Sequence, residues 1–435
     1  MLLEWSRYFG AVAIVPLVVG QAAFIALAGA LTAVAARVGL RSAWVVAAIW
    51  VVIEGARGRV PFGGFPWGEV GVALHNVPVA RSLAGLGGVA LVSFVVVAGN
   101  GLVLDAIDAL GRRERVRLTA AAIGVAVLVV FAGSAHVLRY EPQVTGDLRF
   151  ALLQGNDQNR ELTAAEIADD YLFRSHLELV AALTGQYDLI VFPESALERD
   201  PLRSADVRVA LEQVARAHGA VVLANARTET DDGGLANSNL AYSPEGRLQG
   251  VYSKQHLVPF GEYVPLRGLV SFIGELDQVP YDYERGSERV MYSAAGHRFG
   301  TVICFESAFA PLVRGFVRDG AELVVVTTNN RSYRRSGLAA QHLAMSQMRA
   351  AETARPVLHA SISGITGVID DTGDVHDTSE LFVNKITKGT VQTTTGRTPY
   401  VRFGDWVIYA CVLGLAGAVL RGVRSRRAAA VDSPT

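Results

Sequence analysis

The stretch GTVICFESAF, residues 300–309, ends an apolar β-like run at Cys304 and places Glu306 two residues later. Four more short runs are also apolar and rich in β-branched residues: RFALLQGN (149–156), YDLIVFPESAL (187–197), GAVVLANA (219–226) and AELVVVTTNN (321–330). Continuous runs of this length, separated by helical stretches, are typical of strands that are buried on both faces. The sequence therefore predicts an α/β domain whose strands are covered by helices.

Side chains that can carry chemistry follow these predicted strands. Glu194, Cys304 and Asn329 each come just after an apolar run, and reactive residues collect where the strands of such sheets end. Lys254, one of only three lysines in the chain, lies in the loop-like segment YSKQHLVPFGEYVP (252–265). A carboxylate, an ammonium and a thiol are the parts of a site for nucleophilic acyl transfer. The base takes the thiol proton, the sulfur attacks a carbonyl carbon, and the cation stabilises the oxygen charge that forms.

Long apolar runs outside this region predict membrane-spanning helices. Hydrophobic residues make up 51% of the 435-residue chain and charged residues 19%, which is unusually apolar for a wholly soluble protein. The runs at 10–36, 82–104 and 118–138 can each cross the ~30 Å hydrocarbon core as a helix, and 43–57 and 403–420 are shorter candidates. The net charge of −1 gives no indication of a nucleic-acid partner.

These runs divide the chain into four expected parts. We expect a transmembrane helical domain of about four spans at 1–139, a catalytic domain at 140–402 that opens with a charged linker at 139–149, a C-terminal span at 403–421 and a basic tail at 422–435. Clusters of arginine at 112–117 and 421–427 favour a cytoplasmic position for the link between the third and fourth spans and for the tail. The catalytic domain is then expected outside the cytoplasm, where an unpaired Cys304 is a candidate reactive thiol.

Three motifs, in order, resemble the Glu-Lys-Cys triad of the nitrilase superfamily: FPES at 192–195, Lys254 followed by HLVPFGEYVP, and ICFE at 303–306. The HLVPFGEYVP stretch and the predicted spans are similar to one branch in particular, the apolipoprotein N-acyltransferase family. GGFPW at 63–67 and HLAMSQMRAAETARP at 342–356 also resemble that family. The resemblance extends from about residue 40 to the C-terminus.

The resemblance implies a nitrilase-like four-layer α-β-β-α sandwich on a bundle of transmembrane helices. It implies that Glu194 is the general base, Lys254 the cation beside the oxyanion and Cys304 the nucleophile, with no cofactor and no metal ion. An acyl chain would pass from a membrane phospholipid to a Cys304 thioester, and then to the α-amino group of the N-terminal diacylglyceryl-cysteine of an apolipoprotein. This reaction completes lipoprotein maturation at the bacterial cytoplasmic membrane, with the catalytic domain on the extracytoplasmic face.

Five other residues have weaker assignments. Glu262 and Glu306 would support the site, although Glu262 could instead hold its loop by accepting backbone hydrogen bonds and Glu306 could be a structural ion-pair partner. Trp67 and Tyr333 are candidate substrate contacts, and Trp67 could instead anchor the chain at the membrane interface. His342 is expected on a helix as a packing or hydrogen-bonding residue, because no second histidine or cysteine stands at metal-ligand spacing.

The sequence departs from the family pattern in two places. Members usually have about eight spans where five are expected here, which favours a truncated start or a reduced membrane domain. In TTNNRSYRRS (327–336), Asn330 and Ser332 stand where the family tends to have an acid and a tryptophan, so donor or acceptor choice is expected to differ. Two other functions stay open: a membrane-tethered amidase-like hydrolase, which the altered loop favours, and a catalytically silent lipoprotein-binding partner, which the missing spans favour.

Overall fold

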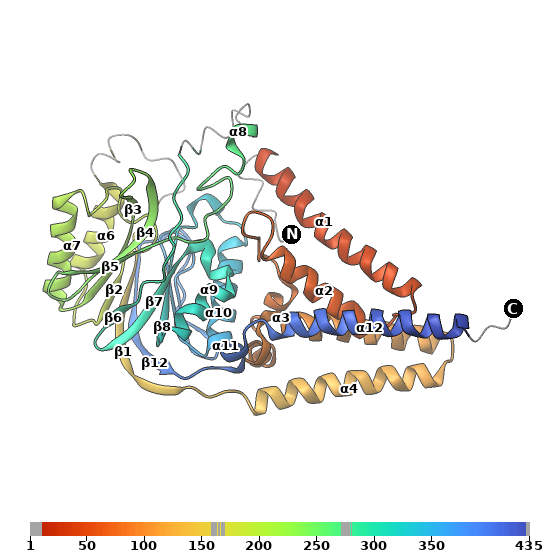
Figure 1. The fold of residues 1–435 in the computed structure, drawn as a ribbon. Coiled ribbons are helices and arrows are strands. Elements are labelled where there is room, and N and C mark those ends of the chain that lie inside the picture. Colours follow the sequence, from red (N-terminus) through yellow and green to blue (C-terminus); the bar gives the residue numbers. More distant parts are fainter. Residues whose placement is uncertain are drawn as a thin grey trace. The chain divides into compact units, whose positions relative to one another are not determined.

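The computed structural model describes residues 11–157, 163, 166, 170–270, 279 and 281–431, which are arranged in two compact units (Figure 1). One unit comprises Met1–Ile14 and Glu141–Arg397, and the other comprises Val15–Tyr140 and Thr398–Thr435. Residues 1–10 and 432–435, which belong to the expected helical domain and basic tail, lie outside the described residues.

The second unit is helical. Its elements are α1 (Ala11–Arg37), α2 (Ala43–Arg57), the 3₁₀ helix η2 (Val70–Leu74), α3 (Pro78–Gly111), α4 (Arg115–Val137), α11 (Pro399–Phe403) and α12 (Trp406–Val431). Among the described residues, three segments are long and apolar enough to cross a membrane, namely Ile14–Arg37, Pro78–Gly111 and Arg115–Val137. These three confirm the three long runs expected from the sequence. The 15 residues of α2 and the apolar part of α12, Trp406–Gly422, form shorter helices.

Small residues allow the helices of this unit to pack closely. A Cβ atom at Gly101 of α3 would lie 2.7 Å from the Cβ of Ala43 on α2, so glycine is required for this approach. Large apolar side chains such as Val19 on α1 and Val130 on α4 are 62% and 67% exposed. Exposed aliphatic surfaces of this kind on long helices are what a lipid environment favours.

The first unit contains two six-stranded sheets. The first has the order β12-β1-β2-β3-β4-β5, with β1 (Gln143–Gln154), β2 (Leu189–Val191), β3 (Val221–Glu229), β4 (Leu235–Tyr242), β5 (Leu248–Ser253) and β12 (Lys385–Thr395). The second has the order β11-β10-β9-β8-β7-β6, with β6 (Tyr292–Ala294), β7 (His297–Ile303), β8 (Leu323–Thr328), β9 (Val357–Ser361), β10 (Gly367–Ile369) and β11 (Val375–His376).

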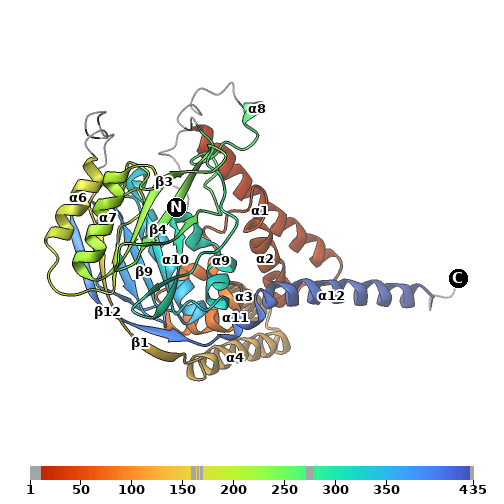
Figure 2. The ribbon, with the colours of Figure 1, turned by 60° about the vertical axis from the view of Figure 1, so that its left-hand side comes forward.

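Helices cover the outer face of each sheet (Figure 2). On the first sheet, α6 (Tyr171–Ala181) packs on β1, and α7 (Ala205–His218) packs on β3 and β4. On the second sheet, α9 (Ala310–Arg318) packs on β7 and β8, and α10 (Leu338–Thr353) packs on β9 and β10. The inner faces of the sheets meet through contacts of β1 and β4 with β7 and of β1 with β9. The expected four-layer α-β-β-α sandwich is therefore confirmed.

Parallel pairing places the ends of several strands together. β1, β2 and β3 are parallel neighbours, and so are β7, β8 and β9. The expected linker at 139–149 is wrong in part, because β1 already begins at Gln143. The whole of β1 pairs with the distant strand β12, from Gln143 opposite Thr395 to Gln154 opposite Lys385.

Candidate active site

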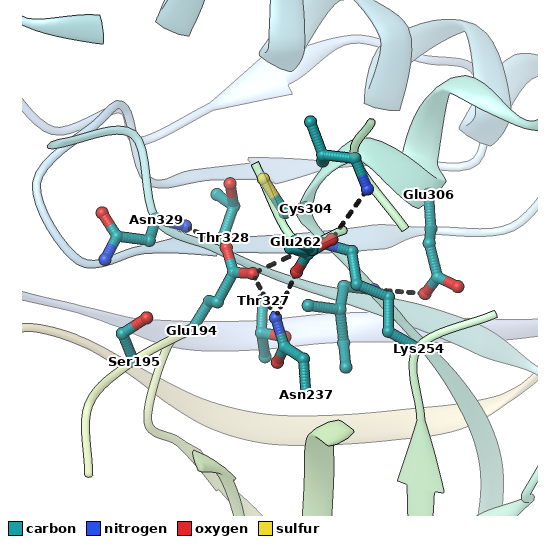
Figure 3. A network of polar contacts seen from close by, with 12 residues as sticks. Glu194, Ser195, Asn237, Lys254, Glu262, Cys304, Glu306, Thr327, Thr328 and Asn329 are labelled. Carbon is teal, nitrogen blue, oxygen red and sulfur yellow. Dashed lines mark hydrogen bonds and ion pairs between the residues drawn. The ribbon is translucent and has the colours of Figure 1, made fainter. Parts of the chain in front are cut away.

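The ends of three strands bring Glu194, Lys254 and Cys304 together between the sheets (Figure 3). Glu194 follows β2, Lys254 directly follows β5 of the same sheet, and Cys304 directly follows β7 of the other sheet. Their exposed fractions are 6%, 1% and 5%. The three residues that the motifs singled out, which are up to 110 residues apart in the chain, therefore share one buried site.

The Lys254 ammonium is held by two carboxylates. Its Nζ donates a hydrogen bond of 2.8 Å to Glu262 Oε1 and lies 3.5 Å from Glu194 Oε1. Burial by itself lowers the pKa of a lysine, but the charges of Glu262 and Glu194 outweigh burial here and raise the pKa of Lys254 well above its usual value. Lys254 is therefore a permanent cation in the site.

Cys304 has a protonated thiol and an unusual backbone. Burial and the neighbouring Glu194 charge raise the pKa of the thiol to about 12, against the opposing effect of Lys254. A nucleophilic role for this sulfur thus requires a base to remove its proton. The residue opens the 3₁₀ helix η4 (Cys304–Ala308) with φ of 52°, a left-handed conformation that a non-glycine residue adopts only when its surroundings impose it.

His342 of α10 contacts the backbone of Cys304. Its Nε2 lies 2.8 Å from the Cys304 carbonyl oxygen, and because a carbonyl only accepts, Nε2 must carry the proton. Burial lowers the pKa of His342 to about 4, so the ring is neutral at physiological pH. The expectation of a hydrogen-bonding histidine on a helix is confirmed.

Asn237 of β4 joins the two carboxylates and was missed in the sequence. Its Nδ2 donates to Glu194 Oε1 at 2.8 Å and to Glu262 Oε1 at 3.0 Å. The Glu262 side chain also accepts the Val258 backbone N–H through Oε2 at 2.8 Å. Glu262 therefore both pairs with Lys254 and holds its own loop, and its support of catalysis stays a prediction.

A row of buried amides lies beneath this contact. Asn225 Nδ2 donates to Asn237 Oδ1 at 2.8 Å and to Asn239 Oδ1 at 3.0 Å. Asn239 in turn bonds Thr301 of β7 at 2.6 Å and Thr327 of β8 at 3.0 Å, so the row ties the first sheet to the second. The only signal in the sequence is the presence of amides inside otherwise apolar strands, where unpaired polar groups are costly.

Glu306 is fully buried and connects the loop of Lys254 to the strand end of Cys304. Its oxygens accept the backbone N–H groups of Gln255 at 2.6 Å, His256 at 3.1 Å and Ile303 at 2.8 Å, and the Tyr252 hydroxyl at 2.9 Å. Burial raises the pKa of Glu306 to about 7, although these backbone donors act against the rise. The carboxylate thus contacts residues adjacent to two members of the expected triad.

The segment after β8 closes another side of the site. The Asn329 backbone N–H donates to Glu194 Oε2 at 2.6 Å, so both oxygens of Glu194 are held. Tyr333 ends the 3₁₀ helix η5 (Arg331–Tyr333). Burial raises its pKa well above the usual value, and the charges at Cys304 and Glu194 add to the rise. A substrate contact by Tyr333 stays a prediction.

Trp67, the other candidate substrate contact, belongs to the helical unit. Its side chain is 3% exposed, its ring stacks near Phe65 with 6.4 Å between the centroids, and its carbonyl accepts a hydrogen bond from Arg57 at 2.6 Å. A substrate contact by Trp67 stays a prediction. Within the described ranges, no group of three or more His, Cys, Asp or Glu side chains is placed to hold a metal ion.

The two-sheet unit is a carbon–nitrogen hydrolase domain, because the model of that family matches residues 150–396. The model of the apolipoprotein N-acyltransferase N-terminal domain matches residues 1–102. The chain belongs to the apolipoprotein N-acyltransferase family. Together with the apolar helices, this membership makes it a membrane protein.

Individual relatives agree with this assignment. The chain is 32% identical over 386 residues to the apolipoprotein N-acyltransferase of Methylococcus capsulatus, a match that covers 87% of this chain and 73% of the relative. It is 29% identical over 377 residues to that of Geobacter metallireducens, with 85% and 72% covered. A solved CN-hydrolase superfamily protein from Xanthomonas campestris is 21% identical with a TM-score of 0.45, and the match covers 61% of this chain and 96% of that one.

Proposed function

We propose that the protein moves an acyl chain from a membrane phospholipid to the α-amino group of the N-terminal diacylglyceryl-cysteine of apolipoproteins, with Cys304 carrying the chain as a thioester. The observation that supports this most directly is the buried cluster of one ammonium and two carboxylates beside a thiol. Such a cluster offers a base, a cation and a nucleophile away from water, which favours transfer to an amine over hydrolysis.

In the first half-reaction, Glu194 takes the thiol proton as the sulfur attacks the ester carbonyl of the phospholipid. Lys254 stabilises the oxyanion: an ammonium has three N–H donors, of which Glu262 and Glu194 occupy two, so one can point to the carbonyl oxygen. The C–O bond then breaks, the lysophospholipid alkoxide takes the proton from Glu194, and an S–C bond to the acyl chain remains.

In the second half-reaction, the α-amino group of the acceptor attacks the thioester carbonyl. Glu194 removes a proton from the attacking amine, an amide bond forms, and the C–S bond breaks. The Cys304 thiolate leaves and recovers the proton from Glu194, which restores the resting state. Asn237 and the Asn329 N–H hold the Glu194 carboxylate in one orientation for both steps.

We place the catalytic unit on the extracytoplasmic face of the bacterial cytoplasmic membrane. The arginines at 112–117, in the link after α3 and in the first turn of α4, support this orientation by the positive-inside tendency. Both substrates are lipid-anchored, so a catalytic unit tethered at a bilayer surface encounters them at high effective concentration.

The test is mass spectrometry of a lipoprotein N-terminal peptide from cells that lack their own acyltransferase and express this chain. A third acyl chain is expected with the native protein and with Cys411→Ser, which changes the only other cysteine, and is expected to be absent with Cys304→Ala. A peptide that stays diacylated although the native protein is present in the membrane would overturn the transferase. Release of free fatty acid in its place would favour the hydrolase.

A further inference from the structure

The segment that follows Asn329 places three arginines at the edge of the site. Residues 331–335 read RSYRR, and the chain contains no acid between Asn330 and Glu352. The segment is tied to the site by the Asn329 backbone N–H, which donates to Glu194. It is also tied by Asp157, which accepts from the Asn329 side chain at 3.4 Å and pairs with Arg331 at 3.4 Å. The site residue Asn329 is therefore followed within six residues by Arg331, Arg334 and Arg335.

The interior of the site has an excess of negative charge. The carboxylates of Glu194 and Glu262 lie there against the single ammonium of Lys254. Asp157, which is 2% exposed, accepts from the Asn329 side chain next to them. Lys254 is 1% exposed and is held by two of these carboxylates, so its charge is not available to a group outside the buried cluster. An anionic ligand would be repelled unless cations at the edge of the site compensate.

The arginine segment supplies such cations in an ordered form. Arg334 and Arg335 are exposed, and the Arg331 side chain is 36% exposed with one nitrogen 3.4 Å from Asp157. The Arg335 guanidinium lies over the Phe382 ring, 5.6 Å from its centroid. Arg334 has φ of 50° and ψ of −145°, a sparsely populated conformation for a non-glycine residue, which shows that the surroundings impose its backbone. The ring contact restricts the Arg335 side chain, so less entropy is lost when this guanidinium binds a ligand.

We propose that Arg334 and Arg335, assisted by Arg331, bind the phosphate of the phospholipid acyl donor. A guanidinium matches a phosphate with two parallel hydrogen bonds, and an exposed planar donor is better suited to this than a buried ammonium. The phosphate and the reacting ester share one glycerol, so holding the phosphate at the edge of the site positions the ester carbonyl at Cys304. This subsite rests on the proposed function.

The experiment measures Cys304 thioester formation by the full-length protein, reconstituted in bilayers of a diether diglucosyl lipid. This host lipid has no acyl ester to donate and no phosphate that would occupy the proposed subsite. Two donors are added separately, the diester phosphatidylglycerol and a diacylglycerol that lacks phosphate. The variant combines Arg334→Gln with Arg335→Gln. Its matched control combines Arg203→Gln with Arg216→Gln, which removes one exposed arginine just before α7 and one in its last turn.

We expect the variant to raise the half-saturating concentration of phosphatidylglycerol about tenfold, as for the loss of charge-assisted hydrogen bonds, and to leave diacylglycerol unchanged. The control should change neither donor. An equal loss of thioester formation with both donors would overturn the subsite, because it would indicate that the arginines act in general membrane docking or that the loop is damaged. Unchanged thioester formation with both donors would also overturn it. Absence of any thioester in the native protein with both donors would instead refute the proposed function.

Discussion

Glu306 allows a quantitative prediction, because its buried carboxylate holds the backbone on both sides of the site. All its hydrogen-bond partners are donors, namely three backbone N–H groups and the Tyr252 hydroxyl. Glu306→Gln keeps the shape of the side chain and removes its charge. The amide nitrogen of glutamine cannot accept a hydrogen bond, so at least one of the backbone donors at Gln255, His256 or Ile303 loses its partner.

The pH dependence of stability follows from the direction of the pKa shift. Burial raises the pKa of Glu306 from 4.5 in the unfolded chain to about 7 in the native state. Between these values the native state binds more protons at Glu306 than the unfolded state. The contribution of Glu306 to stability is therefore fully present below pH 4.5 and is lost as the pH rises through 7. The shift corresponds to a loss of about 3 kcal/mol, complete somewhat above pH 7. Glu306→Gln does not titrate and should lack this loss.

At high pH the Glu306→Gln variant should be less active than the native protein, although it lacks the loss of stability. An unsatisfied buried N–H costs about 1–3 kcal/mol. If this cost raises the barrier to reaction in the aligned site, thioester formation at pH 8 should slow roughly tenfold to a hundredfold. The variant should therefore be less active than the native protein under conditions where it is relatively more stable.

The assay is hydrogen exchange by mass spectrometry on the full-length protein in detergent, from pH 4.5 to 8, with correction for intrinsic exchange rates. Peptides that cover 252–260 and 300–309 report the opening free energy of the two segments that Glu306 joins. Glu288→Gln, which removes an exposed carboxylate, is the matched control. Opening free energies that fall in parallel in the variant and the native protein would refute the titration of Glu306. Native rates of thioester formation in the variant would refute its positioning role.

Two further substitutions test the site. Asn237→Leu removes the two hydrogen bonds that one amide donates to Glu194 and Glu262. We expect the opening free energy to fall by about 3 kcal/mol and thioester formation to be at least about a hundredfold slower. An unchanged rate would contradict a role for this contact. Glu194→Gln removes the charge that helps to raise the pKa of Cys304 to about 12, so in a Cys411→Ser background Cys304 should react faster with methyl methanethiosulfonate at pH 8 although transfer is lost. Labelling at the native rate would show that the Glu194 charge does not raise the pKa of this thiol, and slower labelling would show that the loss of the base outweighs this effect.

Local patterns were sufficient to predict the strands that carry the site. The apolar runs before Glu194, Cys304 and Asn329 became β2, β7 and β8, because a short β-branched run that is buried on both faces has little alternative to a strand. The three long apolar helices were predicted for a similar reason, since a run of about 20 apolar residues has few stable states in water.

Pairing between distant segments was not accessible in the same way. The amide row depends on the register of β3 with β4, which sets Asn225 directly opposite Asn239 and diagonal to Asn237. The start of β1 was assigned to a linker because its exposed residues 143–147 resemble a polar connection. Only its partner β12, more than 200 residues later in the chain, makes this segment a strand.

The sequence alone identified the carboxylate, the ammonium and the thiol that meet in the site, and predicted the long apolar helices. These properties belong to single side chains and short runs, so they can be recognised in the sequence. The tertiary structure decided how the groups act on one another. Burial and contacts across the two sheets raise the pKa values of Lys254 and Cys304. They also allow Asn237 to donate to two carboxylates and place Glu306 between two loops. Charge interactions and hydrogen bonds depend on distance in space, and distance along the chain does not report it.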